Sequence, residues 1–445
     1  MKSSDYFILN TKKKSFRFFN SLFLFNSDEY CKALNSYINN NKSSLKREKE
    51  KLIKHIDLFM KSHNFVFTNK QKIMYDTLCN KEECYLIMFP YQPNLFPSVS
   101  AIAPAVHMET IRIIMEKEYN TTIVPIFLVV DYDNAQDKRF SKAFFPYLAS
   151  STSKLHFNYK IEKAQKYDTM FSIAIPTKNV IDIWKQNIER CVNNLLQAFP
   201  KTEIEFTTKL QTNKNEIDEL LDKAKENEHS FSGFNTYVLY HILVKKWDCG
   251  MFFIEGHNLY LSDTFFSTKI HSNKDKMYHK FNEIHFLLQQ KDIQTSFKEL
   301  SRDSVFFWYY RKKCCTRCKC DVECFENCLP DYIFPDVISD YILDYILIGK
   351  VGSVGYFKQF EATVYSEYIL GELFGIEGSP QLLTCCHMDP FYNLEHEKNL
   401  VIKFCDKKHI DYNEFFKACN DSHCSILYHL LLQGFDPVLN YLKNI

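Results

Sequence analysis

Two short apolar runs, separated by a polar loop and a helical segment, limit what this chain can fold into. The first is CYLIMFP over residues 84–90, and the second lies within TIVPIFLVVDYD over residues 122–133. Runs this short predict buried strands rather than helices. Between them, residues 100–120 place Ile111, Ile114 and Met115 on one helical face. Strand, helix and strand in this order form a βαβ unit, which predicts a parallel sheet.

The whole chain extends well beyond this unit. Its 445 residues exceed the usual size of one domain. We expect an N-terminal helical segment (1–80), a Rossmann-like core with insertions (81–310), a cysteine-rich segment (311–330), a continuation of the core (331–375) and a C-terminal helical region (376–445). The predicted fold class is α/β, with a Rossmann-like parallel-sheet core, inserted connecting segments, helical elements and a cysteine-rich metal knuckle.

Polar side chains follow both predicted strands. Gln92 and Asn94 come after the first strand, and Asp131 and Asp133 end the second. Ligands bind at the carboxyl ends of parallel strands, so these residues are candidate site residues. The amides could orient a carboxylate, hydroxyl or nucleobase edge, and either aspartate could bind an ammonium group, accept its proton or hold Mg²⁺. The alternatives are a simple turn before Pro97 and aspartates that cap the following loop.

Composition narrows the function classes. The net charge is +1, so no overall basic field favours nucleic acid as a partner. No segment offers about 18 uninterrupted apolar residues, which predicts no membrane span. The N-terminal residues resemble an export signal only loosely, so we expect a cytoplasmic protein with reduced cysteines. No GxGxxG or GxxxxGK[ST] pattern is present, which excludes an ordinary dinucleotide site or P-loop.

Six cysteines fall within fifteen positions of the segment RKKCCTRCKCDVECFENC: Cys314, Cys315, Cys318, Cys320, Cys324 and Cys328. Tetrahedral Zn²⁺ takes four soft ligands, and closely spaced cysteines place two sulfurs on one ion. Zinc in a structural role is therefore the favoured interpretation, because sites built only from cysteine are usually closed. An iron–sulfur cluster, free thiols, or recognition of a thiol substrate are the alternatives.

Four segments together resemble the bacillithiol biosynthesis cysteine-adding enzymes. These are MFPYQPNLFPS, VPIFLVVDYDNAQDKRF, HSFSGFNTYVLYHILVKKWDCGMFFIEG and LPDYIFPDVISDYILDYILIGKVGSVGYFKQF, which occur in the family's order across about residues 30 to 370. The chain departs from the family pattern at Pro97 and Ser98, where the family has a glycine pair, and at Tyr132, where it has histidine. The family's long C-terminal coiled coil has no counterpart here.

The resemblance implies a Rossmann-type core and a ligase that joins the carboxyl group of cysteine to the amine of a glucosaminyl-malate-like acceptor. It also implies a site for ATP or another adenine nucleotide. On this reading the catalytic candidates are Asp131, Asp133 and Gln92. The candidates for binding substrate or nucleotide are Gln92, Asn94, Ser98, Ser230, Gly349, Gly352 and Tyr356. For Ser230 a helix N-cap is the plainer role.

Two other functions stay open at this stage. One is a Rossmann enzyme that transfers an aminoacyl or nucleotidyl group to a different acceptor. The other is a zinc-knuckle protein that binds nucleic acid or a protein partner on a degenerate scaffold. Aromatic and basic residues near the cysteines are the evidence for it. A homodimer is compatible with the sequence under each of them.

Overall fold

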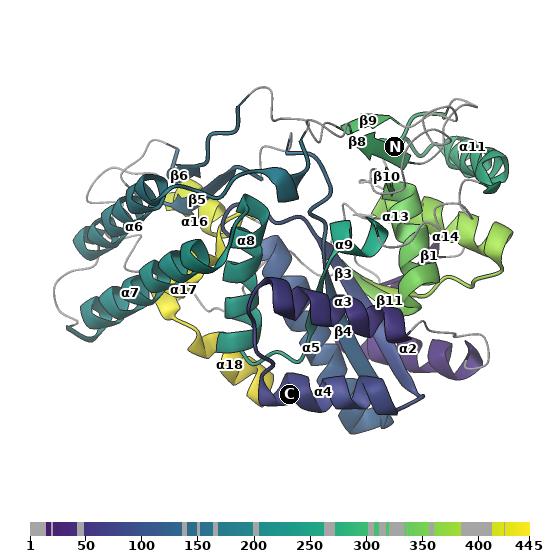
Figure 1. Cartoon of the computed structure of the whole chain (residues 1–445), viewed down its shortest axis with the longest axis horizontal. Helices are drawn as coiled ribbons and strands as arrows, with labels where there is room; N and C mark the ends of the chain where they lie inside the picture. The colour runs from purple at the N-terminus through teal and green to yellow at the C-terminus, as the bar shows by residue number, and fades with distance from the viewer. Residues whose placement is uncertain are drawn as a thin grey trace.

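A computed structural model describes residues 15–18, 21–41, 49–135, 140–148, 152–162, 168–198, 204–261, 272–300, 307–310, 317–319, 333–335, 337–355, 360–383, 412–421 and 423–445. Within these ranges a seven-stranded sheet forms the centre of the protein (Figure 1). Among the described helices, none combines the length and the apolar character needed to cross a membrane.

The central sheet has the strand order β1–β2–β12–β11–β3–β4–β7. Every neighbouring pair is parallel except β1 and β2, which are antiparallel. The strands are β1 (Ser15–Phe18), β2 (Ser21–Leu24), β3 (Cys84–Tyr91), β4 (Thr122–Val129), β7 (Phe252–Glu255), β11 (Lys350–Gly355) and β12 (Pro380–Leu383). The predicted α/β class with a parallel sheet is confirmed.

The βαβ unit lies in the middle of this sheet. Strands β3 and β4 pair in unbroken register from Cys84–Thr122 to Tyr91–Val129. Helix α5 (Val99–Tyr119) connects them, and Asn120 ends it in the left-handed conformation, with φ of 50°. Both strands are almost wholly buried, which explains why each reads as a continuous apolar run.

Helices cover the sheet. Helix α2 (Ser27–Asn41) packs on α5, β11 and β12, and α3 (Lys49–Ser62) packs on β7. The other helices of this part are α4 (Asn69–Asn80), α9 (Gly256–Leu261), α11 (Lys274–Gln290), α13 (Val337–Leu343) and α14 (Phe360–Phe374). A separate helical group, to the left in Figure 1, contains α6 (Lys178–Ala198), α7 (Ile204–Asn227), α8 (Phe231–Tyr240), α16 (Tyr412–Cys419), α17 (Ile426–Gln433) and α18 (Asp436–Lys443).

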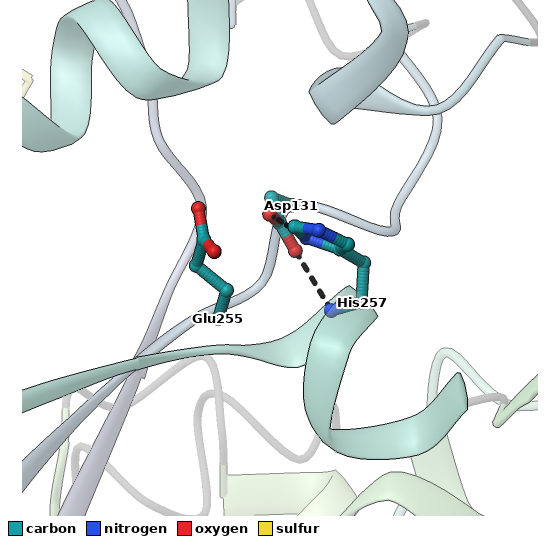
Figure 2. Close-up of side chains that lie close together, drawn as sticks. All are labelled: Asp131, Glu255 and His257. Atoms are coloured by element: carbon teal, nitrogen blue, oxygen red, sulfur yellow. Dashed lines mark hydrogen bonds and ion pairs between the residues drawn. The ribbon is translucent and has the colours of Figure 1, made fainter. Parts of the chain in front are cut away.

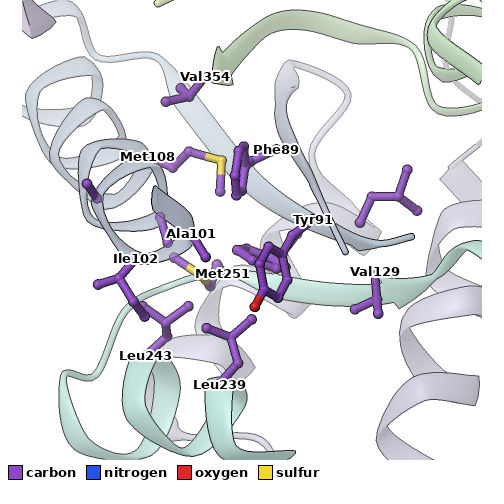
Figure 3. Close-up of a cluster of buried hydrophobic side chains, with 14 of the residues drawn as sticks. Phe89, Tyr91, Ala101, Ile102, Met108, Val129, Leu239, Leu243, Met251 and Val354 are labelled. Atoms are coloured by element: carbon purple, nitrogen blue, oxygen red, sulfur yellow. The ribbon is translucent and has the colours of Figure 1, made fainter. Parts of the chain in front are cut away.

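The core between the sheet and its covering helices is dense and apolar. Figure 3 shows Phe89 and Tyr91 of β3 facing Met108 and Ile102 of α5, with Leu239 of α8 nearby. These side chains are at most 6% exposed. Burial of such residues removes apolar surface from water at about 25 cal/mol per Å² and fixes the ends of β3 and β4 in place.

Strand order reverses between β3 and β11. From β3 the chain adds β4 and β7 on one side, and from β11 it adds β12 on the other. In open parallel sheets, such a reversal leaves a crevice outside the carboxyl ends of the strands, where ligands bind. The residues after β3 and β4 are therefore in a favourable position for a site.

Some strands lie in segments that we expected to be helical. Strands β1 and β2 fall within residues 1–80, and β12 falls within residues 376–445. Each has only four residues, which is too few to show a strand period in the sequence. Strand β2 pairs with β12 through Leu22–Pro380, Phe23–Gln381 and Leu24–Leu382.

Two small sheets lie outside the central one. Strands β5 (Lys142–Pro146) and β6 (Lys154–Asn158) form a hairpin, and β8 (Phe307–Tyr310) lies between β10 (Ile333–Pro335) and β9 (Arg317–Lys319). Short helical pieces complete the described chain: η2 (Met170–Ser172) and the π-helical η3 (His241–Lys246) and η5 (Asp344–Ile348).

Candidate functional site

The polar side chains predicted at the carboxyl ends of β3 and β4 meet. Gln92 follows the last residue of β3, and its Nε2 donates a hydrogen bond to Oδ2 of Asp133 at 2.6 Å. The second oxygen of Asp133 accepts the backbone N–H of Asn134 at 2.8 Å. Gln92 from the loop after β3 and Asp133 from the loop after β4 are therefore in direct contact, at the edge of the sheet where the strand order reverses.

Asn94 lies in the same turn with an oxygen that lacks a partner. Its backbone N–H donates to the carbonyl of Gln92 at 2.8 Å, which tightens the turn. Its Oδ1 is buried and, among the described residues, meets no hydrogen-bond donor. A buried acceptor left unpaired costs free energy on the order of 1–3 kcal/mol, so this oxygen is well suited to a donor on a ligand.

Asp131, two residues before Asp133, is buried. Its side chain is 1% exposed, and Oδ1 accepts the backbone N–H of His257 at 3.0 Å. Its Oδ2 lies 2.5 Å from Nδ1 of the same histidine. Backbone bonds from Phe171 and Met170 to the carbonyls of Asp131 and Asp133 hold the loop from the other side.

Glu255 and His257 come from the neighbouring strand. Glu255 is the last residue of β7 and pairs in register with Val129 of β4. Gly256 then starts α9, where a Cβ would come within 2.5 Å of the Tyr132 ring. Glycine at this position lets α9 begin close against the loop, so that His257 reaches Asp131. Figure 2 shows Asp131 and His257 in contact, with Glu255 beside them.

A second histidine, His63, bridges the carboxyl groups of Glu228 and Glu255. His63, just after α3, places Nδ1 2.7 Å from Oε1 of Glu228 and Nε2 3.1 Å from Oε1 of Glu255. The other oxygen of Glu255 accepts Nδ2 of Asn258 at 2.7 Å. Glu255 is thus held by donors on both of its oxygens.

The carboxylates beside His257 and His63 raise the pKa of both imidazoles. Burial alone would lower the pKa of His257, but the carboxylates of Asp131 and Glu255 raise it to about 9. Burial likewise acts against His63, whose hydrogen bonds to Glu228 and Glu255 raise its pKa to about 10. Burial would raise the pKa of Glu255, and the hydrogen bond from His63 lowers it overall.

Donor atoms for a cation also meet here. One ligand atom each from Asp131, Glu255 and His257 lie within 4.8 Å of one another. The sequence led us to expect Mg²⁺ at Asp131 or Asp133, whereas the structure directs Asp133 toward Gln92. We call Gln92, Asn94, Asp131, Asp133, Glu255 and His257 together the carboxyl-edge centre.

Glu255 and His257 were not among the residues predicted from the sequence. The available signal was position: a glutamate that ends a buried strand, followed within two residues by histidine, lies where parallel sheets place their ligands. His63 follows a helix and carried no such signal.

Four other predicted site residues have local structural roles. Ser230 is the N-cap of α8, where its Oγ accepts the N–H of Gly233 at 2.9 Å. Ser98 is the N-cap residue of α5, and its Oγ contacts Oγ of Ser100 at 2.8 Å. Gly349 precedes β11 with φ of 67°, at the amino end of the strand. Gly352 allows Tyr30 to approach β11, because a Cβ there would lie 2.2 Å from the tyrosine oxygen.

The remaining predictions fall outside what the structure describes. Tyr356 is one of them, and so are five of the six cysteines, Cys314, Cys315, Cys320, Cys324 and Cys328. Cys318 lies in β9, but its side chain is outside the described part. The zinc knuckle therefore stays a prediction.

Comparisons with known proteins identified no family for this chain. Neither models of protein families nor the curated proteins gave a match to the chain.

Proposed function

We propose that the protein is a ligase that forms an amide between the carboxyl group of cysteine and the amine of a small, hydroxylated acceptor of the glucosaminyl-malate type. The observation that carries this proposal is the contact between Gln92 and Asp133, in the same turn as Asn94, whose buried Oδ1 meets no donor among the described residues. The three side chains offer a carboxylate, an amide and a free acceptor at the reversal of strand order, where parallel sheets bind ligands. The resemblance of the flanking segments supplies the substrate class.

Amide formation sets specific demands on such a site. The carboxyl group must first be activated, as an acyl phosphate or an adenylate from ATP or another adenine nucleotide. The amine nitrogen then attacks the carbonyl carbon, a C–N bond forms, and the C–O bond to the phosphate or nucleotide breaks. The nitrogen loses a proton in the process, so a base is needed within hydrogen-bond reach.

Asp133 suits the role of that base. As a carboxylate it can hold the ammonium group of the acceptor and then take its proton, while Gln92 keeps the carboxylate in position through the 2.6 Å bond. Asn94 can accept a hydrogen bond from a hydroxyl or amine of the same acceptor. Asp131 is bonded to His257 and is a less accessible base.

The test is direct product detection. Full-length protein is incubated with cysteine, ATP and an amino-sugar conjugate, and mass spectrometry follows the acceptor. We expect a product heavier by one cysteine less one water. Asp133→Asn keeps the size of the side chain but removes the base, and should lower the rate about 100-fold, as loss of a general base commonly does.

A matched control is Asp57→Asn, on the exposed face of α3, where the carboxylate accepts a hydrogen bond from the Tyr75 hydroxyl at 2.8 Å. This variant should keep the rate of the unmodified protein. No cysteinyl product with any amine acceptor, or a product formed equally well by Asp133→Asn, would refute the proposal.

A further inference from the structure

We propose that Asp131, Glu255 and His257 form a binding site for one divalent transition-metal ion. The three residues are supplied by two adjacent parallel strands and the helix that follows the second. The inference goes beyond the proposed ligase activity, because metal binding can be measured with no substrate present and does not depend on which reaction the protein catalyses.

The spacing of the donor atoms fits one ion. Metal–nitrogen and metal–oxygen bonds are about 2.0–2.2 Å long, so two ligands on opposite sides of an ion are separated by about 4.2 Å. The donor atoms of Asp131, Glu255 and His257 lie within 4.8 Å of one another. The direct contact between Asp131 Oδ2 and His257 Nδ1, at 2.5 Å, would open to admit the ion, while the more widely spaced donors would move slightly inward.

Contacts around the three residues already hold them in orientation. Oδ1 of Asp131 accepts the backbone N–H of His257, which leaves Oδ2 directed at the imidazole. Oε2 of Glu255 accepts Nδ2 of Asn258. The His257 ring stacks on Phe171, with ring centres 4.5 Å apart and planes at 24°. Outer contacts of this kind orient ligands in known metal sites.

His63 acts as one of these supporting groups, because it is not a member of the set of donor atoms that lie within 4.8 Å of one another. Its two ring nitrogens are already engaged, one with Glu228 and the other with Glu255. It therefore fixes the orientation of the Glu255 carboxylate through Oε1. The ligand set is two carboxylates and one imidazole. A metal ion that binds here displaces the proton shared by His257 and Asp131, and the two carboxylates with a neutral imidazole then balance a divalent cation.

The donor types select the class of ion. Mg²⁺ prefers an all-oxygen octahedron, whereas a mixed set with one imidazole suits Mn²⁺, Fe²⁺ or Zn²⁺. Three protein ligands leave coordination positions open, as in catalytic metal sites. An ion here would lie next to Asp133 and Gln92 and could polarise an acyl or phosphoryl oxygen of a bound substrate.

Mn²⁺ is the best probe for this site, because thiolate-rich segments such as residues 314–328 favour softer ions. Full-length protein is freed of metal with a chelator and titrated with MnCl₂, and free Mn²⁺ is read from its electron paramagnetic resonance signal. We expect one bound Mn²⁺ per chain with micromolar affinity, and weaker binding of Mg²⁺ in competition. His257→Gln and Glu255→Gln should each lower the affinity for Mn²⁺ at least tenfold.

Asp133→Asn is the matched control, because Asp133 lies beside the site and is directed at Gln92. It should bind Mn²⁺ with unchanged affinity even though it loses ligase activity, so the two proposals fail separately. No bound Mn²⁺, or equal affinity in folded His257→Gln, overturns the metal site. If circular dichroism shows that His257→Gln is unfolded, Asn258→Ala is used in its place. This variant should lower the affinity for Mn²⁺ about tenfold, and an unchanged affinity overturns the inference.

Discussion

His257 at the carboxyl-edge centre keeps 20% of its side chain exposed, whereas Lys350 and Asp344, a buried ion pair elsewhere in the sheet region, keep 1% each. The Lys350 Nζ lies 3.3 Å from Oδ2 of Asp344 and over the rings of Tyr341 and Tyr345. This pair lies at the start of β11, at the opposite end of the strand from the site edge. Both regions bury charge, but the centre keeps part of one charged side chain exposed to solvent.

Glu367 extends the fully buried region. Its Oε1 accepts hydrogen bonds from Tyr345 at 2.8 Å and from Gln381 at 2.7 Å, and Ser379 contacts the same tyrosine at 2.6 Å. We call Asp344, Tyr345, Lys350, Glu367 and Gln381 the β11–α14 cluster. It has charged and polar groups of the same kinds as a site, but they are directed at one another.

The difference teaches that buried charge does not by itself mark function. A polar network enclosed between packed elements fixes how those elements pack, whereas a network at the carboxyl ends of the strands, with part of His257 exposed, can exchange a partner for a ligand. The following variants test whether the two regions divide in this way.

The largest effect should come from Lys350→Met. It removes the cationic partner of the Asp344 carboxylate and leaves that charge buried, and breaking a buried ion pair in this way costs about 3–5 kcal/mol. Equilibrium unfolding in urea measures this loss. The control is Lys280→Met, a lysine nearer the surface with two carboxylate partners, expected to cost below about 1 kcal/mol. A stable but inactive Lys350→Met would place this cluster within the site.

Glu367→Gln should change how stability depends on pH. Burial raises the pKa of Glu367 from 4.5 to about 7, so the folded state favours the protonated carboxyl. Its contribution is therefore full below pH 4.5 and is lost as pH rises to about 7, which amounts to about 3 kcal/mol. The free energy of unfolding of Glu367→Gln should lack this fall. Glu299→Gln, on the surface, should keep it, and identical pH curves for the two variants would contradict the assignment.

The smallest effect should come from Ser230→Ala. Loss of the N-cap bond to Gly233 should lower stability by about 1 kcal/mol. Ligase turnover and Mn²⁺ affinity should be unchanged, because Ser230 caps α8 and does not belong to the centre. A rate that falls tenfold or more while the melting temperature moves by only a few degrees would return Ser230 to the site.

The sequence was informative where the signal was local. The apolar runs of β3 and β4 and the helical face of α5 predicted the centre of the sheet, and the rule for strand ends selected Gln92 and Asp133. Glu255 and His257 were missed because their contact with Asp131 joins residues about 125 positions apart, and no local pattern encodes that distance. Strands β2 and β12 were missed because four residues cannot display a period.

The partnership of β2 with β12 also has a consequence for biosynthesis. Residues 22–24 find their parallel neighbour only at residues 380–382, so the N-terminal strands must wait for most of the polypeptide to leave the ribosome. Until then β2 has an exposed strand edge with unpaired backbone N–H and C=O groups, and such edges promote aggregation. A nascent chain of this protein therefore needs shielding of its earliest segment, by a chaperone or by transient local contacts, long after β3 and β4 have become available to pair.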